Sequence, residues 1–491
     1  MADAVATVAE SRGLATGARI FGDVLRSKHA PETLRQTLWY KVGMSNNPRR
    51  LQTWAAIVVA AGGVLAAVIG GLAIHLNATA APLHPQPERA PSVTRSAPSP
   101  QWSKAVDRAR HIVRAGLSGQ NLPGLSVAVG VAGDLVWAEG FGWADLKTRA
   151  PVTPETRFRI GTASKVLTST AVGMLLEKGR LQLDEQIQTY VPQFPKKRWP
   201  VTLRHLMGDV AGVGTDGGDE GPLLRQRCER PVDALRFFAD GELLFEPGTQ
   251  YRDSKYGWIL VSAAVEAAAD QRFLTFMREQ IFQPLAMNDT GAESPTAENP
   301  DHVGEPEEDP PFLTAFHDMI LEPLGIGVTK TTSGTVDRAT FYAPPTASRA
   351  TFYFPKFRTE PRYGPHLMRP HNLSCYAGSM AFFSTPSDLV RFGLALNRGK
   401  LLQPATAQLL QTSQHLTSGQ ETGYGLGWNL ETVTLAGEAT RAAGANGETL
   451  GCRVMSLMTF RKRGIVVAVM SNMLSSDTSA LARQVAQAFV Q

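Results

Sequence analysis

The stretch Arg157-Phe-Arg-Ile-Gly-Thr-Ala-Ser-Lys165 runs directly into a helical pattern over residues 162–178, which Gly179 ends. Thr162 and Lys165 are three positions apart, so in a helix they lie about one turn apart on the same face. Ser164 is about 200° around the helix from Thr162, and we expect it to face away from Thr162. A hydroxyl close to a lysine makes this stretch a candidate for nucleophilic chemistry.

The sequence on both sides of this stretch mixes strand and helix patterns. Apolar residues alternate over 125–131, a turn follows at Gly133, and an apolar run returns to residue 143, which predicts a β-hairpin. Helical runs cover residues 102–117, 257–269 and 479–490, and a β-branched strand covers 464–470. We therefore predict an α+β fold with an antiparallel sheet flanked by terminal helices, plus a helical subdomain.

Several phrases in this region resemble the serine β-lactamase and penicillin-binding-protein family, in which a Ser-x-x-Lys tetrad opens a buried helix. The matching phrases follow the family's order over about residues 120–475. They include Pro154-Glu-Thr-x-Phe-x-Ile-Gly161, Phe245-Glu-Pro-Gly248, Ser384-Thr-Pro-Ser-Asp-Leu389 and Tyr424-Gly-Leu-Gly-Trp428. Tyr190-Val-Pro-Gln-Phe-Pro195 is most similar to the mitochondrial serine β-lactamase-like members of animals. The resemblance implies the β-lactamase/transpeptidase-like fold.

The resemblance also implies three reactive motifs. In the family a serine attacks an acyl carbon, a lysine and a tyrosine move protons, and backbone N–H groups of the serine and of an edge strand form the oxyanion hole. In this sequence Thr162 replaces the serine, and only Lys165 of the tetrad is unchanged. Asp253-Ser-Lys255 stands where the family has Tyr-x-Asn, and Ala445-Asn-Gly447 where it has Lys-Thr-Gly or His-x-Gly.

Carried over by position, the resemblance assigns catalytic places to Thr162, Lys165, Asp253 and Lys255. It assigns oxyanion and third-motif places to Thr162, Asn446, Gly447 and Glu448. The family's Leu-x-x-His-x-Ser-Gly phrase reads Leu206-Met-Gly-Asp-Val-Ala-Gly212 in this sequence.

Two hypotheses follow from these replacements. In the catalytic one, Thr162 is the nucleophile and Asp253 its base, which requires burial to raise a carboxyl pKa that is ordinarily about 3.9. In the other, Asp253 pairs with Lys165 or Lys255, Lys165 stays protonated, and Thr162 caps the helix. A nucleophile elsewhere, such as Ser164 or Ser254, is a further option. We expect a serine-hydrolase-like protein with impaired or altered acyl transfer.

The alternative function is a non-catalytic cleft for a small molecule, a peptide, a cell-wall fragment or a protein partner. Self-association is a further possibility, implied only by filament-forming animal relatives. We expect no cofactor, because the ten histidines show no metal-binding spacing and the three cysteines form neither a C-x-x-C pair nor a disulfide scaffold.

Residues 51–87 contain no Lys, Arg, Asp or Glu, and residues 53–76 are apolar. A run of this length predicts a transmembrane helix, and Arg49 and Arg50 before it place the N-terminus in the cytoplasm. We expect a basic cytoplasmic tail (1–50), a signal-anchor (51–76), a Pro/Ala-rich linker (77–100) and an extracytoplasmic domain (101–491). Retention of the anchor is favoured over cleavage after Ala78-Thr-Ala80. The composition favours a bacterial inner membrane.

The net charge of +5 does not indicate a nucleic-acid partner. Residues 1–50 hold eight basic and four acidic residues, so 8 − 4 = +4 of the charge lies in the predicted tail. The remaining domain is nearly neutral. An aromatic and basic stretch over residues 349–362 fits single-stranded nucleic acid less well than a strand and loop over the cleft, given the predicted location.

Overall fold

The computed structural model describes residues 62–63, 66–71, 74, 82–215, 221–292, 349–355, 365–368, 371–450 and 452–490. The chain divides into residues 1–79 and a compact unit that begins at Ala80, and the following paragraphs concern the second unit. Most of the predicted span, and all of the predicted cytoplasmic tail, lie outside the described residues. Among the residues that are described, no helix is both long and apolar enough to cross a membrane.

The centre of the unit is an antiparallel sheet that joins the two ends of the domain. Its strands, in spatial order, are β1 (Ser92–Thr94), β3 (Asp134–Asp145), β2 (Gly124–Val131), β13 (Ile465–Ser471), β12 (Cys452–Phe460), β11 (Glu438–Thr449) and β10 (Asn429–Leu435), and β4 (Ala150–Pro151) pairs with β3. β2 lies next to β13, with Val129 opposite Val467. The predicted hairpin, the late β-branched strand and the α+β class are confirmed.

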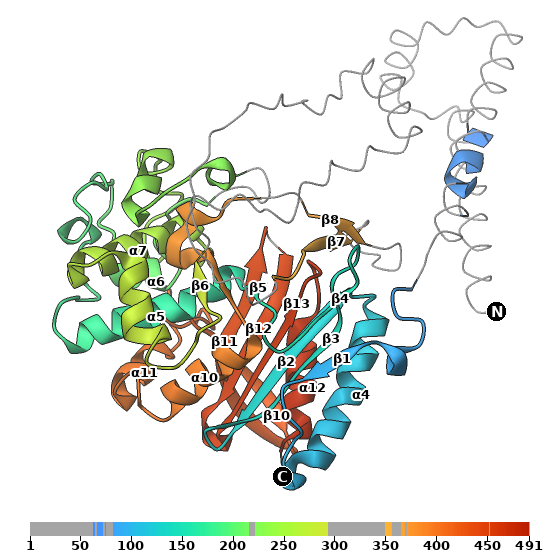
Figure 1. Ribbon diagram of the computed structural model, residues 1–491. Helices are drawn as coiled ribbons and strands as arrows, with labels where there is room; N and C mark the ends of the chain where they lie inside the picture. Colours follow the sequence, from blue (N-terminus) through green and yellow to red (C-terminus); the bar gives the residue numbers. More distant parts are fainter. Residues whose placement is uncertain are drawn as a thin grey trace, which may run out of the picture. The chain divides into compact units, whose positions relative to one another are not determined.

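Helices cover both faces of this sheet (Figure 1). α4 (Ser103–Gly119) and α12 (Thr478–Ala488) pack on one face, where alternate residues of β2 and β13 such as Val129 and Val467 are buried. α10 (Pro386–Asn397) packs on the other face, against residues such as Ala128. The central strands are therefore buried on both sides, which explains their nearly continuous apolar sequence.

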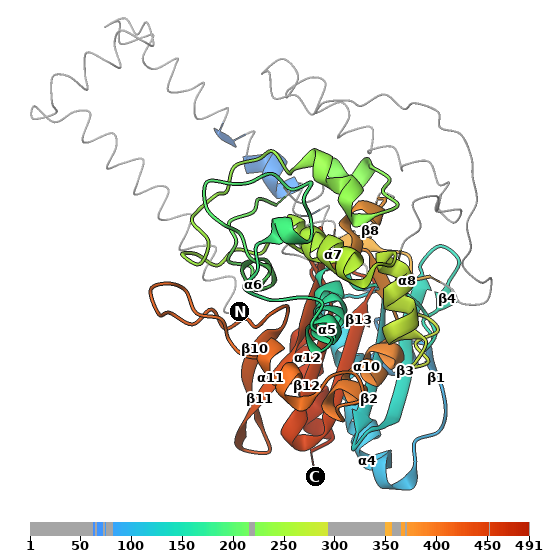
Figure 2. The same cartoon turned by 90° about the vertical axis from the view of Figure 1, so that its left-hand side faces the viewer.

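The helical subdomain lies on the side of the sheet that α10 also covers, and its helix α5 contacts β11 (Figure 2). It contains α5 (Ser164–Glu177), α6 (Leu203–Met207), α7 (Lys255–Ala269), α8 (Phe273–Met277) and α11 (Pro404–Leu410), as well as a 3-10 segment, Ser374–Ser379. A disulfide between Cys228 and Cys375 ties that segment to the chain before α7. Two of the three cysteines are thus paired, although 147 residues separate them and no sequence pattern indicates the pair.

The predicted linker and domain boundary need a correction. A 3-10 turn at Pro87–Arg89 and strand β1 at Ser92–Thr94 belong to the compact unit, and β1 pairs with β3 in the register Val93 to Gly140. The compact unit therefore begins before residue 101.

Candidate active site

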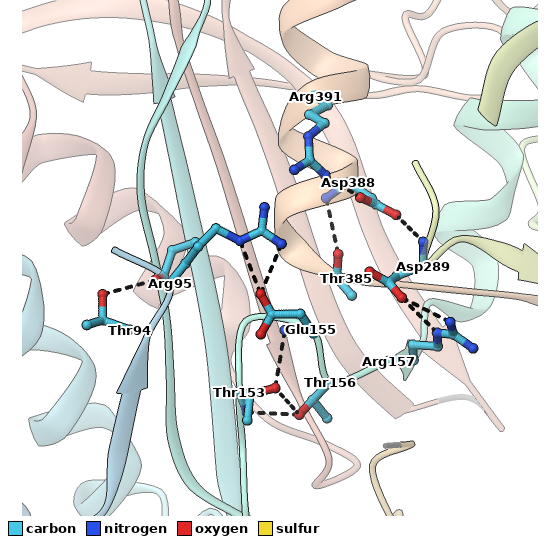
Figure 3. Close-up of polar contacts among 11 residues, drawn as sticks. Thr94, Arg95, Thr153, Glu155, Thr156, Arg157, Asp289, Thr385, Asp388 and Arg391 are labelled. Atoms are coloured by element: carbon cyan, nitrogen blue, oxygen red, sulfur yellow. Dashed lines mark hydrogen bonds and ion pairs between the residues drawn. The ribbon is translucent and has the colours of Figure 1, made fainter. Parts of the chain in front are cut away.

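Contacts among residues 157–159, 289 and 382–388 fix the position of the chain just before Thr162 (Figure 3). The Arg157 guanidinium pairs with Asp289 at 3.0 Å, and the backbone N–H of Asp289 donates to Asp388 Oδ2 at 3.0 Å. Thr385 caps α10 by accepting from the N–H of Asp388. β5 (Phe158–Arg159) then pairs with β9 (Phe382–Ser384) and leads into the 3-10 turn that contains Thr162.

Gly161 explains how Thr162 comes so close to β11. Gly161 has φ +53°, and a Cβ at this position would lie 2.1 Å from the carbonyl oxygen of Glu448. Only glycine fits this approach without strain. As a result, the Thr162 hydroxyl donates to the carbonyl of Asn446 at 3.2 Å and accepts from the N–H of Glu448 at 3.0 Å.

These contacts decide two of the sequence-based expectations about Thr162. It does not cap α5, because the N-cap position is Ala163 and no side chain caps that helix. Its hydroxyl also bonds to β11 and to neither Lys165 nor Asp253. The N–H of Glu448, which the resemblance places in the oxyanion hole, is already occupied by the Thr162 hydroxyl.

Lys165 lies in a buried cluster of charges. Its Nζ is 3.0 Å from Asp209 Oδ2 and 2.5 Å from Asp253 Oδ1, and it sits 5.6 Å from the centre of the Trp258 ring. The Lys165 side chain is 3% exposed and that of Asp209 is 0% exposed. Burial alone would lower the pKa of Lys165, but the two carboxylates outweigh it and raise that pKa above its ordinary value. Lys165 is therefore an ammonium at neutral pH.

Asp209 is a central residue of the site to which the sequence argument gave no role. Its Oδ1 accepts from the N–H of Ser254 and from the indole N–H of Trp258, both at 3.2 Å. Burial and the neighbouring charge of Asp253 raise the pKa of Asp209 to about 7 against the attraction of Lys165. The histidine position in the family phrase was the one signal that could have indicated it.

Asp253 does not meet the condition that a general base requires. Its side chain is 49% exposed, and although burial acts to raise its pKa, the charges of Lys165 and Lys255 prevail and lower it. A carboxylate with a lowered pKa is a poor acceptor for an alcohol proton. Of the two partners considered for Asp253, the structure shows contact with Lys165, while Lys255 begins α7 and acts on Asp253 through its charge.

The two serines considered as alternative nucleophiles both have structural roles. Ser164 is fully buried; its hydroxyl donates to the carbonyl of Gly161 at 2.7 Å and accepts from the N–H of Phe382. Ser254 donates to the carbonyl of Gly214 and caps α7 by accepting from the N–H of Gly257 at 2.9 Å. Ser164 thus faces away from Thr162, as expected, and both hydroxyls are engaged.

The third motif contributes its backbone more than its side chains. The Asn446 amide oxygen accepts from Ser456 at 2.9 Å and from Ser479 of α12 at 2.8 Å, so the side chain points through the sheet away from Thr162. Gly447 allows the carbonyl of Ile160 to approach, since a Cβ there would lie 2.1 Å from that oxygen.

Two further groups border the site. The Glu448 carboxyl is partly buried, and burial together with the charge of Asp253 raises its pKa. Tyr251 is 41% exposed, and its ring lies 5.6 Å from that of Tyr424. Burial and the charge of Asp209 raise the pKa of Tyr251, so its phenol is neutral. In the described parts of the chain, no three His, Cys, Asp or Glu side chains gather in a way that could hold a metal ion.

Comparison with known proteins assigns the fold and the family. The Beta-lactamase family model matches residues 109–490, which is more than half of the chain. The chain therefore belongs to the beta-lactamase family, a class that includes penicillin-binding-protein-like relatives, and its α+β architecture is the β-lactamase/transpeptidase-like fold.

Individual relatives are distant. The serine beta-lactamase-like protein LACTB, mitochondrial, of Bos taurus is 28% identical over 259 residues, which cover 38% of this chain and 46% of that protein. A beta-lactamase of Escherichia coli K12 is 31% identical over 188 residues, covering 38% and 47%. The matches thus span less than half the length of these curated relatives.

Solved structures extend the likeness in fold only. EstCE1, described as a hydrolase with promiscuous acyltransferase activity, has a TM-score of 0.57 at 18% identity. The match covers 80% of this chain and 100% of EstCE1. The D-amino acid amidase of Ochrobactrum anthropi has a TM-score of 0.57 at 19% identity, covering 78% and 98%.

Proposed function

We propose that this chain is a membrane-anchored, extracytoplasmic member of the beta-lactamase family in which acyl transfer by the usual serine–lysine chemistry is impaired. The observation that carries the proposal is the position of Lys165 between Asp209 and Asp253. An ammonium in contact with two carboxylates has no lone pair to take a proton from a nucleophile.

The state of Thr162 supports the same conclusion. Its hydroxyl donates to the carbonyl of Asn446 and accepts from the N–H of Glu448. That N–H would otherwise be available to stabilise an oxyanion. Acylation would require this side chain to leave β11, and its β-branch restricts the rotamers through which it could do so. Nucleophile, base and oxyanion donor are therefore each compromised, and such groups act as a unit rather than independently.

The location outside the cytoplasm rests on the charge pattern before the apolar run and is supported by the disulfide. Arg49 and Arg50 precede residues 51–76, which is the pattern of an anchor with its N-terminus inside. A disulfide between Cys228 and Cys375 suits an oxidising compartment such as the bacterial periplasm.

A second candidate function is non-catalytic binding of a peptide or small molecule at the same site. The exposed groups favour it: Asp253, which contacts Lys165, is 49% exposed, and Tyr251 is 41% exposed. Self-association is the remaining alternative, and size-exclusion chromatography with light scattering of the detergent-solubilised protein would test it.

The deciding experiment treats the full-length protein in detergent with a fluorescent penicillin, a fluorophosphonate and p-nitrophenyl esters. We expect neither covalent labelling nor turnover above the level of Thr162→Ala, while an active penicillin-binding protein in the same buffer is labelled. Labelling that Thr162→Ala abolishes would show an active enzyme and overturn the proposal. Labelling that survives in Thr162→Ala would overturn it as well and place the nucleophile elsewhere.

A further inference from the structure

The segment that follows the predicted anchor is fastened to the domain almost at once. The N–H of Leu83 donates to Asn121 at 2.7 Å, and the buried His84 side chain bonds to the carbonyl of Pro123 at 3.1 Å. Arg114 of α4 then donates to the carbonyls of Pro87 and Ala90, and β1 adds to the edge of the sheet. We call residues 83–95 the strap.

The strap leaves only a short tether to the membrane. Residues 77–82 separate the apolar run from Leu83. Even when fully extended, these residues reach at most about 25 Å. Under the proposed membrane anchor, this length limits how far Leu83 and His84 can lie from the lipid surface.

The β3–β4 end of the sheet adjoins the strap, since the N–H of Gly142 donates to the carbonyl of Pro91 at 2.9 Å. The turn between β3 and β4 exposes Lys147, Thr148 and Arg149. This end of β3 lies next to His84, because a Cβ at Gly142, one residue before Trp143, would lie 3.2 Å from His84 Nε2. The Arg149 guanidinium lies 5.4 Å from the centre of the Trp143 ring.

A second pair of strands lies at the same end (Figure 1). The Tyr353 hydroxyl of β7 (Tyr353–Pro355) accepts from the N–H of Leu146 at 2.8 Å. β7 pairs with β8 (Pro365–Leu367), and Leu367 is 43% exposed. We call the surface formed by Trp143, Lys147, Arg149 and Leu367 the strap end.

Two acidic side chains lie near the strap end: Asp145, which is half-buried, and Glu88, which is 68% exposed. Asp145 accepts from the N–H and hydroxyl of Thr148 and from the hydroxyl of Thr351. Glu88, on the strap, lies within 3.8 Å of the Arg114 guanidinium and 3.4 Å of the His111 ring. Lys147 and Arg149 thus dominate the exposed charge of the β3–β4 turn.

We propose that the strap end rests on the outer surface of the membrane and contacts anionic lipid headgroups. Basic side chains beside an anchor are attracted to anionic lipids, and tryptophan and exposed leucine suit the interface. The opposite end of β3, at the β2–β3 turn, then points away from the lipid. This inference rests on the proposed membrane anchor.

The test uses spin labels on the full-length protein in vesicles, one variant at a time. Thr148→Cys places a label in the strap end. Lys462→Cys places the control label at the far end of the twelve-residue strand β3. Lys462 lies two residues before Gly464, whose carbonyl accepts from the N–H of Ala132 in the turn that precedes β3. Both variants carry Cys452→Ser and keep the native disulfide. Vesicles contain phosphatidylcholine alone or with one quarter phosphatidylglycerol.

We expect the Thr148 label in phosphatidylglycerol vesicles to collide at least threefold more with oxygen, relative to a water-soluble nickel chelate, than the Lys462 label does. Lys147→Glu/Arg149→Glu should remove most of this difference. Arg461→Glu/Lys462→Glu, an equal charge change at the far end, should not alter the Thr148 label.

Equal water accessibility of the two labels would overturn the docking. A Thr148 label that is protected to the same degree without anionic lipid, and after the charge reversal, would overturn the headgroup contact. An alkaline carbonate wash separates this outcome from failure of the anchor. Protein that stays in the vesicles while both labels are in water refutes only the docking, whereas protein that washes off refutes the anchor and the docking together.

Discussion

Replacing Asp209 should destabilise the protein far more than its single negative charge suggests. Asp209→Ala leaves the Lys165 ammonium in a buried place with Asp253 as its remaining carboxylate partner. It also leaves the N–H groups of Ser254 and Trp258 without the acceptor that lies 3.2 Å from each of them. Because Asp253 still pairs with Lys165, the loss should stay below the cost of a buried charge without a partner, and we expect about 2–3 kcal/mol of the free energy of unfolding.

The assay is guanidinium unfolding of the full-length protein in detergent, followed by tryptophan fluorescence. Asp184→Ala is the matched control, because its pair with Arg204 is on the surface, with Asp184 74% exposed. We expect the control to lose less than about 1 kcal/mol. In the double variant Asp209→Ala/Lys165→Met the buried charge is absent, so the loss should be smaller than the sum of the two single losses.

A loss of less than about 1 kcal/mol for Asp209→Ala would refute this reasoning, since such a value is typical of a surface pair and not of a buried one. Strict additivity in the double variant would refute it independently. In that case Lys165 and Asp209 would contribute to stability without interacting, contrary to the 3.0 Å contact.

Three further predictions concern the disulfide, the pKa of Asp209 and the conformation of Gly161. Cys228→Ser/Cys375→Ser should lower the free energy of unfolding by about 2–5 kcal/mol, measured under the same conditions, because the bond closes a long loop. The pKa of Asp209 is raised to about 7 from 3.8, so the folded state binds the proton of this carboxyl more tightly than the unfolded state does. The contribution of Asp209 to the free energy of unfolding should therefore fall as the pH rises from about 4 to about 7. Asp209→Asn should flatten that part of the stability profile. Gly161→Ala should destabilise the protein by at least about 1 kcal/mol in thermal unfolding, because φ is +53° and the new Cβ would meet the carbonyl of Glu448 at 2.1 Å; a variant as stable as the wild type would show that the 3-10 turn moves freely.

The sequence predicted the sheet well because its periodicity is strong there. Alternation over residues 125–131 and β-branching over 464–470 correspond to β2 and β13, and these two strands lie side by side. The strap was less visible, because its prolines are typical of a spacer. Its attachment depends on contacts with residues far along the chain, such as the Arg114 guanidinium with the carbonyl of Pro87.

The site was predicted in part. The pair between Lys165 and Asp253 was one of the alternatives that local sequence allowed, and the structure shows it. Asp209 was missed because its interaction with Lys165 spans 44 residues and depends on a buried geometry that no spacing encodes. The expected helix cap by Thr162 was wrong because the positive φ of Gly161 turns the chain so that the hydroxyl meets β11.

The replacements around Lys165 are physically dependent on one another. A tyrosine at position 253 would leave Lys165 with less opposing charge, whereas an aspartate there holds it as an ammonium. Burial, together with the charge of Asp253, raises the pKa of Asp209 to about 7 against the attraction of Lys165, whereas Lys165 and Lys255 lower the pKa of Asp253. Restoring a serine at position 162 alone would leave this balance of charges, and the protonated lysine, intact. The site is thus a charge cluster, and the impaired acyl transfer that we propose follows from the cluster as a whole rather than from the missing serine.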